Sequence, residues 1–366
     1  MSQPRLGCPL EDLDTPALTI DLDIFEQNIA RMAELTRRHA IAWRPHSKAH
    51  KSPAIAQLLV AAGAIGVTCA KLGEAEVMAA GGIRDVLIAN QLVGPLKMRR
   101  LAALCRLADP IVAIDHVNHI EMLGQAMRQA EVQLRVVIEV DLGFNRAGVP
   151  PGPKVRELAQ RILEQRGLVM AGIMGYEGHL LTIEDPVEKS EKIRQALAEL
   201  VEAKEMLTAA GLPCPIVSAG GTGSYSTALE CRGLTELQAG GLILMDEFYR
   251  ERCGVRQFGH ALKLITTVSS RPTASRAIID AGRKSQHMDM QPPRVLGYDT
   301  IRVVRLSAEH GELELGADGQ QLRIGDRLEL IPGYSDFTTV MHDEFYGMRN
   351  GHLEVIWPLE ARGKIR

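Results

Sequence analysis

Between residues 41 and 245 the chain repeats one unit, a short apolar segment followed by a longer segment whose apolar residues have helical spacing. The longer segments, which we expect to be helices, include Lys51–Ala62, Gly73–Ala80, Pro95–Arg106, Val117–Ala130, Pro153–Gln165 and Asp185–Ala210. The apolar segments, which we expect to be strands, are Ile41–His46, Ile65–Thr68, Val86–Ala89, Ile111–Ile114, Leu134–Val140, Val169–Met174, Pro215–Ser218 and Gly241–Met245. Eight strands that alternate with helices over about 200 residues are typical of a parallel (β/α)8 barrel of the TIM type, an α/β fold. An open doubly wound sheet is the alternative, because periodicity does not show whether a sheet closes.

The pattern changes after Arg252, where short apolar segments follow one another without helices between them. We expect strands at Leu262–Ser270, Ala277–Asp280, Thr300–Ser307, Glu312–Leu315, Arg327–Ile331, Thr338–Met341 and Leu353–Trp357. Turn residues separate these segments, and Asn350-Gly351 is a strong hairpin signal. The sequence therefore predicts a barrel over residues 22–252 and a C-terminal all-β domain, residues 253–366, that includes the N-terminal strand within residues 1–21.

Composition excludes several classes of partner. The formal net charge of -3 gives no reason to expect binding to nucleic acid or to an anionic membrane. No apolar run approaches the ~18 residues of a membrane helix, and residues 1–14 lack the apolar core of a signal peptide. The six cysteines form no CxxC pair, so we expect reduced thiols rather than a disulfide framework or a zinc site. These features predict a cytoplasmic protein.

In a (β/α)8 barrel the active site lies on the loops that follow the carboxyl ends of the strands. Polar or titratable residues follow the predicted strands, among them His46, Lys48, His50, Lys51, Cys69, Lys71, Asn90, Gln91, Asp115, His116, Asp141, Arg146, Tyr176, Glu177, His179, Asp246 and Glu247. Each one alone is more often a helix cap or a solvated loop residue. Their recurrence at one position predicts an active site on this rim of the barrel.

Lys48 is the first candidate catalytic residue, because it directly follows the strand predicted at Ile41–His46. At the mouth of a buried strand an ammonium group is poorly hydrated, which favours the neutral amine that forms an imine with a carbonyl group. The alternative is a lysine in a solvated basic loop. The sequence alone leaves both interpretations open.

A second candidate is the segment Ser218–Tyr225, which follows the seventh predicted strand and contains three glycines. Successive backbone N–H groups in such a loop suit a phosphate group, and barrels commonly bind phosphate after strands seven and eight. The alternative is a flexible glycine-rich connection. An imine-forming lysine and a phosphate loop on the same rim together indicate a pocket for pyridoxal phosphate.

Several longer motifs carry a family resemblance that runs through nearly the whole chain. They are TPAL at 15–18, RPHSKAHK at 44–51, TCAKLGEAEVM at 68–78, IANQLVG at 88–94, EVDLGFNRAGV at 139–149, SAGGTGS at 218–224, ELQAG at 236–240, MDEFY at 245–249, DAGRK at 280–284 and SAEHGEL at 307–313. With these motifs the chain resembles the D-threonine aldolase and D-serine dehydratase-like family. That family belongs to the pyridoxal phosphate enzymes of the alanine racemase fold type.

The resemblance implies roles for residues on the rim. Lys48 would carry pyridoxal 5'-phosphate as an imine, and His179 would act as a proton shuttle. Arg146 would lie near the phenolate side of the cofactor, and Tyr176 and Gln238 beside its ring. The phosphate would be held by the loop that contains Ser218, Gly220, Gly221, Thr222 and Gly223. Only Lys48 and the glycine-rich loop are also indicated independently by the residues themselves.

The same resemblance implies a divalent metal on the C-terminal β domain, held in the aldolases by a histidine and an aspartate that follow a proline. Here the corresponding stretch is Pro332-Gly333-Tyr334-Ser335-Asp336, with tyrosine at the histidine position. A neutral phenol is a poor substitute for imidazole. Asp336 alone would suit a hard, mostly hydrated ion such as magnesium or manganese. The alternative is an ordinary polar group near a strand end.

The resemblance implies a homodimeric enzyme that acts on a small amino-acid substrate. We expect a pyridoxal phosphate-dependent lyase that cleaves D-β-hydroxy-α-amino acids by a retro-aldol reaction, because Asp336 matches the aldolases. The alternatives are a D-serine or D-hydroxyaspartate dehydratase, an amino-acid racemase, and a non-catalytic pyridoxal phosphate carrier. The all-β domain argues against the carrier, because such carriers resemble the barrel alone.

Overall fold

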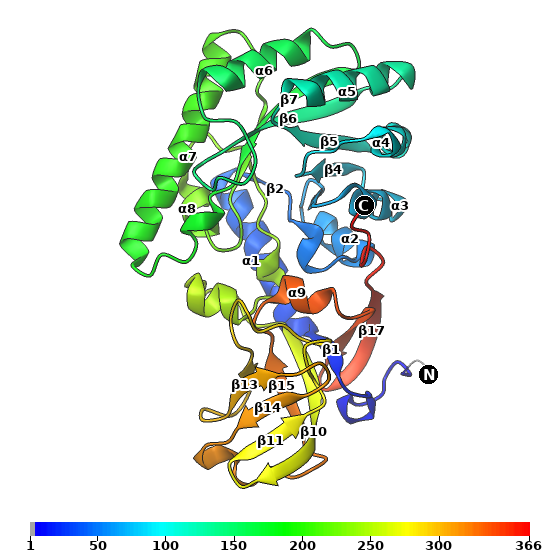
Figure 1. Ribbon diagram of the computed structural model, residues 1–366, viewed down its shortest axis with the longest axis vertical. Helices are drawn as coiled ribbons and strands as arrows, with labels where there is room; N and C mark the ends of the chain where they lie inside the picture. Colours follow the sequence, from blue (N-terminus) through cyan, green and yellow to red (C-terminus); the bar gives the residue numbers. More distant parts are fainter. Residues whose placement is uncertain (1–3) are drawn as a thin grey trace. The chain divides into compact units, whose positions relative to one another are not determined.

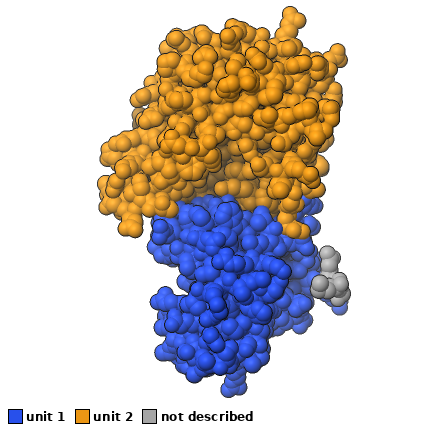
Figure 2. Space-filling model, viewed as in Figure 1, with its two compact units in different colours: residues 1–29, 241–360 blue, residues 30–240, 361–366 orange. Residues whose placement is uncertain are grey.

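The computed structural model of the protein describes residues 4–366. The chain divides into two compact units (Figure 2). The barrel unit consists of Ala30–Gly240 and Ala361–Arg366, and the β unit consists of Met1–Ile29 and Gly241–Glu360. Helix α1 (Leu22–His39) contributes residues to both units. The domain limits that the sequence suggests, at residues 22 and 252, stay a prediction.

The barrel unit is built on an eight-stranded parallel sheet, which confirms the fold class expected from the sequence. The order of the strands is β2-β9-β8-β7-β6-β5-β4-β3. The strands are β2 (Ala42–Trp43), β3 (Val67–Cys69), β4 (Asp85–Ile88), β5 (Asp109–Ile114), β6 (Leu134–Val140), β7 (Leu168–Gly175), β8 (Ile216–Ala219) and β9 (Glu236–Leu237). The ends of the sheet meet, because the Ile65 amide donates to the Trp43 carbonyl at 2.8 Å and the Thr68 amide to the Pro45 carbonyl at 3.0 Å. The sheet is therefore curled, as in a TIM barrel.

Helices surround these strands in Figure 1. They are α2 (Pro53–Ala61), α3 (Leu72–Ala80), α4 (Pro95–Leu107), α5 (Val117–Gln129), α6 (Pro153–Leu163), α7 (Pro186–Ala209) and the short α8 (Tyr225–Glu230). Pro95, Pro153 and Pro186 each stand in the first turn of a helix, where the missing N–H is not needed. No helix within residues 4–366 is both long enough and apolar enough to cross a membrane.

The eighth strand is β9 at Glu236–Leu237, so the expected strand at Gly241–Met245 is wrong. That apolar run begins with a 3-10 helix, η4 (Gly241–Ile243), and belongs to the β unit. Periodicity does not separate a buried strand from other buried segments of this length. Asp246 and Glu247 therefore do not follow a barrel strand, and the residue that follows β9 is Gln238.

The polar first residue of β9 is part of an ionic layer inside the barrel. The buried Arg44 guanidinium pairs with Glu236 at 3.0 Å and with Asp85 at 2.8 Å, and Asp85 also pairs with Arg135 at 2.7 Å. Glu236 and Asp85 are the first residues of their strands. The layer thus lies at the amino ends of the strands, opposite the rim where a barrel places its active site. We assign Arg44 to stability rather than to chemistry.

The β unit contains a nine-stranded mixed sheet in the order β11-β14-β13-β12-β15-β10-β1-β16-β17. Its strands are β1 (Ala17–Asp21), β10 (Leu262–Thr273), β11 (Arg276–Ile279), β12 (Arg294–Val295), β13 (Arg302–Leu306), β14 (Gly311–Glu314), β15 (Arg327–Ile331), β16 (Glu344–Arg349) and β17 (His352–Pro358). Strand β1 pairs antiparallel with β10 and parallel with β16. The N-terminal strand is therefore part of this sheet, as the sequence predicts.

One strand expected in this unit is wrong. Residues Thr338–Met341 were expected to be extended because they are rich in β-branched side chains, but Ser335–Thr339 forms the helix α9. The Thr338 hydroxyl donates to the Tyr334 carbonyl one turn back, at 3.0 Å, which satisfies its buried polar group within the helix. The strand next in the chain is β16, which the sequence pattern did not reveal.

Candidate active site

Lys48 lies on the 3-10 helix η2 (Ser47–Ala49), directly after β2. The His46 side chain caps this helix, because its Nδ1 accepts the Lys48 backbone N–H at 3.3 Å. Lys51, the other lysine of this segment, forms an ion pair. The Lys51 ammonium is held by the buried Glu74 carboxylate in a close ion pair. The structure thus commits Lys51 to a supporting contact.

The charges around His46 show which side chains share this part of the rim. Burial lowers the pKa of His46 well below its usual value, and the positive charges of Lys48, Lys51 and Arg146 lower it further. Lys48 and Arg146 are 98 positions apart in the sequence and yet act on the same imidazole. The neutral imidazole lies in a positive field, which suits an anionic ligand.

Phe144 joins three of the predicted site residues. The Arg146 guanidinium lies 5.0 Å from the centre of the Phe144 ring and 5.6 Å from that of Tyr176. The Tyr176 ring meets Phe144 edge-on at 5.8 Å, and the His179 imidazole stacks on Phe144 at 6.0 Å with an interplanar angle of 19°. The structure therefore brings Arg146, Tyr176 and His179 together around a residue that sequence reasoning did not single out.

Two carboxylates shape the loop that carries Phe144 and Arg146. The Asp141 carboxylate accepts the backbone N–H groups of Gly143 and Asn145, each at 3.0 Å. The Glu139 carboxylate lies 3.6 Å from the Arg146 guanidinium and accepts the Gln91 amide. Burial raises the pKa of Glu139, and the bond from Gln91 opposes the increase. Glu139 was part of a family motif, but nothing in the sequence assigned it this contact.

The glycine loop, Ser218–Ser224, starts with the last two residues of β8 and continues beyond the strand, and it needs its glycines. Gly220 has a φ of +75°, and a Cβ there would lie 2.3 Å from Cδ1 of Leu237 and 2.8 Å from Cβ of Ala228. A Cβ on Gly221 would lie 3.2 Å from the Tyr176 ring. The backbone of the loop therefore packs so closely against Leu237, Ala228 and Tyr176 that a side chain at Gly220 or Gly221 would disturb it.

Gln238 completes the site from the end of β9. Its backbone N–H donates to the Gly220 carbonyl at 3.1 Å, and its side-chain amide donates to the Ser218 hydroxyl at 2.9 Å. Correct placement of the eighth strand explains why this residue lies on the rim. The structure thus brings Ser218, Gly220 and Gln238 together, while Thr222 and Gly223 are buried in the same loop.

These residues fit pyridoxal phosphate. A lysine follows one strand, and a loop with three glycines lies at the end of another. Arginine and aromatic side chains come from the loops between them. The positive field around His46 matches the negative charge of a phosphate ester.

The segment Pro332–Asp336 of the β unit does not fit a tightly held metal. The Tyr334 hydroxyl donates to the Asp336 carboxylate at 2.7 Å, and the Tyr334 ring is packed edge-on against Phe248, Tyr249 and Phe337. Within residues 4–366, no group of three or more His, Cys, Asp or Glu side chains is placed to hold a metal ion. One carboxylate that already accepts a phenol is a poor donor set for a transition metal.

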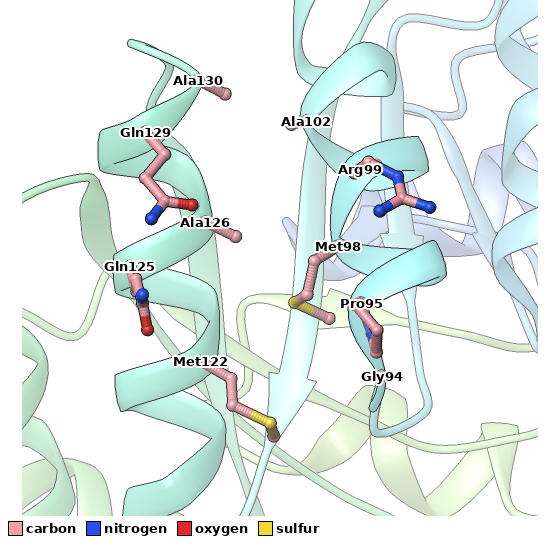
Figure 3. A pocket seen from close by; sticks show the side chains of 10 residues that line it. All are labelled: Gly94, Pro95, Met98, Arg99, Ala102, Met122, Gln125, Ala126, Gln129 and Ala130. Carbon is pink, nitrogen blue, oxygen red and sulfur yellow. The ribbon is translucent and has the colours of Figure 1, made fainter.

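A groove elsewhere on the barrel unit has little chemistry. Figure 3 shows Met98 of α4 and Met122 of α5 on the two sides of the space between these helices, with Gln125 and Arg99 nearby. Its lining contains no carboxylate, histidine or cysteine. This groove therefore gives no candidate for acid–base or metal chemistry.

Comparison with known proteins agrees with this geometry. Residues 20–247 match the family model "Alanine racemase, N-terminal domain", and residues 261–348 match a serine dehydratase domain. The chain is 37% identical to D-threonine aldolase of Arthrobacter sp, with 98% of this chain and 96% of that protein covered. It is 36% identical to 3-hydroxy-D-aspartate aldolase of Paracoccus denitrificans (strain Pd 1222), with 98% and 94% covered.

A solved structure extends the match to the fold. The crystal structure of D-threonine aldolase from Filomicrobium marinum has a TM-score of 0.97 to this protein, with 36% identity and 100% of both chains covered. Membership of the family implies pyridoxal phosphate as the cofactor. The chain therefore belongs to the alanine racemase N-terminal domain family and is homologous to its pyridoxal phosphate-dependent aldolases, which are carbon–carbon lyases.

Proposed function

We propose that this protein cleaves D-configured β-hydroxy-α-amino acids between the α and β carbons and releases an aldehyde and a smaller amino acid such as glycine. The observation that carries this proposal is the full-length similarity to two aldolases that differ in the group on the β carbon. The reaction class is common to both relatives. The group on the β carbon is therefore the part of the substrate that assays must determine.

The residues on the rim supply the binding groups for this reaction. Lys48 would hold pyridoxal phosphate covalently, the glycine loop would receive the phosphate, and Arg146 would face the phenolate oxygen. Tyr176 and Gln238 would flank the ring. When bound, the cofactor supplies an electron sink for the bond that breaks. Glu139 keeps Arg146 in place, because the two side chains form an ion pair next to Gln91.

A retro-aldol cleavage also needs a base, since the β-hydroxyl group must lose its proton as the carbonyl group of the aldehyde forms. His179 is our choice for this base. It is exposed, and its stacking on Phe144 sets the plane of the imidazole beside Tyr176. Tyr176 contacts the same Phe144 ring and also has a hydroxyl group that can exchange a proton. We therefore assign both residues to proton handling, with His179 as the group that accepts the proton.

No step is assigned to a metal, although Asp336 was the metal ligand suggested by the sequence. The bond from Tyr334 to Asp336 and the surrounding aromatic rings leave one carboxylate as the donor set, which would support at most a weakly held magnesium or manganese ion. A homodimer and a cytoplasmic location are also part of this proposal, and they rest on the family resemblance and on composition.

One alternative reaction has an observation in its favour. Residues 261–348 match a serine dehydratase domain, which suggests loss of the β-hydroxyl group as water rather than cleavage of the carbon–carbon bond. That departure needs an acid or a Lewis-acidic metal at the hydroxyl oxygen. The resemblance implies the same metal for the aldolases, so the Pro332–Asp336 segment does not separate the two reactions. We favour the aldolase because the similarity to two aldolases covers nearly the whole chain.

A panel of substrates tests the proposal. The purified protein, loaded with pyridoxal phosphate, is incubated with D-threonine, 3-hydroxy-D-aspartate and D-serine, and with the L-forms as controls. We expect an aldehyde or 2-oxo acid fragment together with glycine from the D-form of at least one of the first two substrates. Formation of a 2-oxo acid with ammonia and without glycine would establish the dehydratase. Racemised substrate alone would establish a racemase, and no turnover of any member would support a carrier.

A further inference from the structure

Glu177 is a buried carboxyl group on the rim that has no part in the reaction described above. It directly follows Tyr176 and precedes the 3-10 helix η3 (Gly178–Leu180). Its relative exposure is 0%. A carboxyl group is almost never fully buried without a partner for its charge, so this position requires an explanation.

Ser224 links the carboxyl group of Glu177 to the glycine loop. The Ser224 hydroxyl donates to Oε1 of Glu177, and the same hydroxyl oxygen accepts the Gly221 N–H at 3.0 Å. Oε2 is buried and has no hydrogen-bond partner within residues 4–366. Glu177 thus connects the end of β7 to the loop after β8 through Ser224.

The electrostatic surroundings oppose the ionised form of Glu177. Burial raises its pKa, and the hydrogen bond from Ser224 and the backbone amides of Gly220 and Gly221 oppose the increase. A second titratable group faces it, because the charge of Glu177 raises the pKa of Cys231 beyond the effect of burial. Arg194 of α7 acts on that thiol in the opposite direction.

A phosphate on the glycine loop would add negative charge close to this carboxyl group. A phosphate ester is a dianion above its second pKa of about 6. The dianion and an ionised Glu177 would repel each other and would compete for the same backbone amides. A protonated Glu177 avoids the repulsion and keeps Oε1 as the acceptor for Ser224.

We propose that Glu177 is a positioning residue of the glycine loop that takes up a proton when the phosphate group of the cofactor binds. The proposal rests on the proposed pyridoxal phosphate site. It predicts that cofactor affinity falls as the pH rises, since the proton becomes harder to supply. This pH dependence should require the phosphate group of the cofactor and should not depend on the pyridine ring or on Lys48.

The test compares the full-length apoprotein with its Glu177→Gln variant between pH 7 and 9. Glutamine keeps an oxygen for Ser224 and has no proton to take up. The dissociation constants of pyridoxal phosphate and of pyridoxal, which lacks the phosphate, are measured by fluorescence titration. In the wild type we expect the affinity for pyridoxal phosphate to fall relative to the variant by up to about tenfold per pH unit. For pyridoxal the two proteins should have the same pH dependence.

Calorimetry in buffers with different ionisation enthalpies gives a second measurement, and we expect up to about one more proton taken up by the wild type than by the variant. Identical pH dependence of the two proteins for pyridoxal phosphate would overturn the proposal. If neither protein binds pyridoxal phosphate, the proposed function fails instead. Should the glutamine variant not fold, Ser224→Ala removes the link to Gly221. It should weaken binding of pyridoxal phosphate by about tenfold and leave pyridoxal unaffected, and an unchanged affinity for both would overturn the positioning role.

Discussion

The glycine loop of the barrel unit and the Pro332–Asp336 segment of the β unit are both places where the family resemblance implies a bound group, and they differ in what they offer it. The loop has glycines where its backbone packs closely against neighbouring side chains, and it contains the residues that the resemblance assigns to the phosphate. In the other segment a tyrosine hydroxyl already occupies the single carboxylate. The difference shows that a family site must be checked donor by donor, because one exchanged residue changes the ligand that it suits.

The largest expected effect is at Lys48, because this substitution tests whether the barrel unit binds the cofactor at all. Lys48→Ala should reduce turnover by about a thousandfold or more, since the covalent attachment of the cofactor is lost. Lys51→Arg is the matched control, because arginine keeps the ion pair with Glu74. Borohydride reduction followed by peptide mass spectrometry identifies the lysine that carries the cofactor. Labelling of any other lysine in the wild type would refute the assignment.

The second prediction concerns a histidine introduced at position 334 of the Pro332–Asp336 segment. Tyr334→His should increase the affinity for manganese by about a hundredfold. A residue that only hydrogen-bonds to a metal ligand already contributes up to about that factor. Imidazole is a good ligand for such ions, and the substitution also removes the phenol from Asp336. Electron paramagnetic resonance of free manganese measures the binding.

Tyr334→Phe is the control for this experiment, since it removes the hydroxyl group and adds no donor. We expect no gain in affinity from it. If the wild type retains one manganese ion per chain after gel filtration, the conclusion that the segment does not fit a metal is wrong.

Much of the fold and part of the candidate site could be predicted from the sequence, because their signals lie in short segments of the chain. The alternation of strand and helix indicated the barrel, and Lys48 and the glycine loop were recognisable from short segments. The eighth strand was misplaced because β9 has only two residues and begins with Glu236, whose charge is satisfied by Arg44. The helix α9 was missed because propensity gave no information on the bond from Thr338 to Tyr334.

The parts of the site that could not be predicted depend on contacts between distant positions. Glu177 meets Ser224 across 47 positions, and Gln91 meets Glu139 across 48. Phe144 gains its place from rings on another loop. A single sequence lists such residues among many polar or aromatic ones and does not show which of them pack together.

The third prediction concerns the shape of the glycine loop. Gly220→Ala should lower the free energy of unfolding by about 2 kcal/mol more than Gly211→Ala. Both glycines have positive φ, +75° and +70°, so both substitutions strain the backbone. Only at Gly220 would the new Cβ also overlap neighbours, Leu237 and Ala228, whereas nothing lies within 4 Å at Gly211.

Urea unfolding of the two variants measures this difference. Titration with pyridoxal phosphate should show weaker binding for Gly220→Ala only, since the loop must move to relieve the overlap. Equal losses of stability in the two variants would mean that the packing around the loop is looser than the structure shows.

The smallest expected effect is a pH dependence from His50, which follows η2 and Lys48. Burial and the charge of Lys51 lower the pKa of His50 to about 3. Nδ1 accepts the Ser52 amide at 3.2 Å, a bond that requires this nitrogen to be unprotonated. In the unfolded chain a histidine titrates near 6.5. As the pH falls below that value the unfolded state gains a proton that the folded state does not, so the stability decreases by up to about 1.4 kcal/mol per pH unit.

His50→Asn places an amide oxygen where Nδ1 accepts the Ser52 amide, and it removes the titrating group. Between pH 6.5 and 5 the variant should therefore lose up to about 2 kcal/mol less unfolding free energy than the wild type. His310→Asn makes the same exchange at an exposed turn of the β unit and should leave the slope unchanged. Parallel slopes for His50→Asn and the wild type in urea unfolding would mean that His50 is hydrated in solution. The segment around Lys48 and His50 would then be more open to water than its buried residues indicate. The barrel unit would offer the cofactor a less closely packed site, and its difference from the Pro332–Asp336 segment would be smaller.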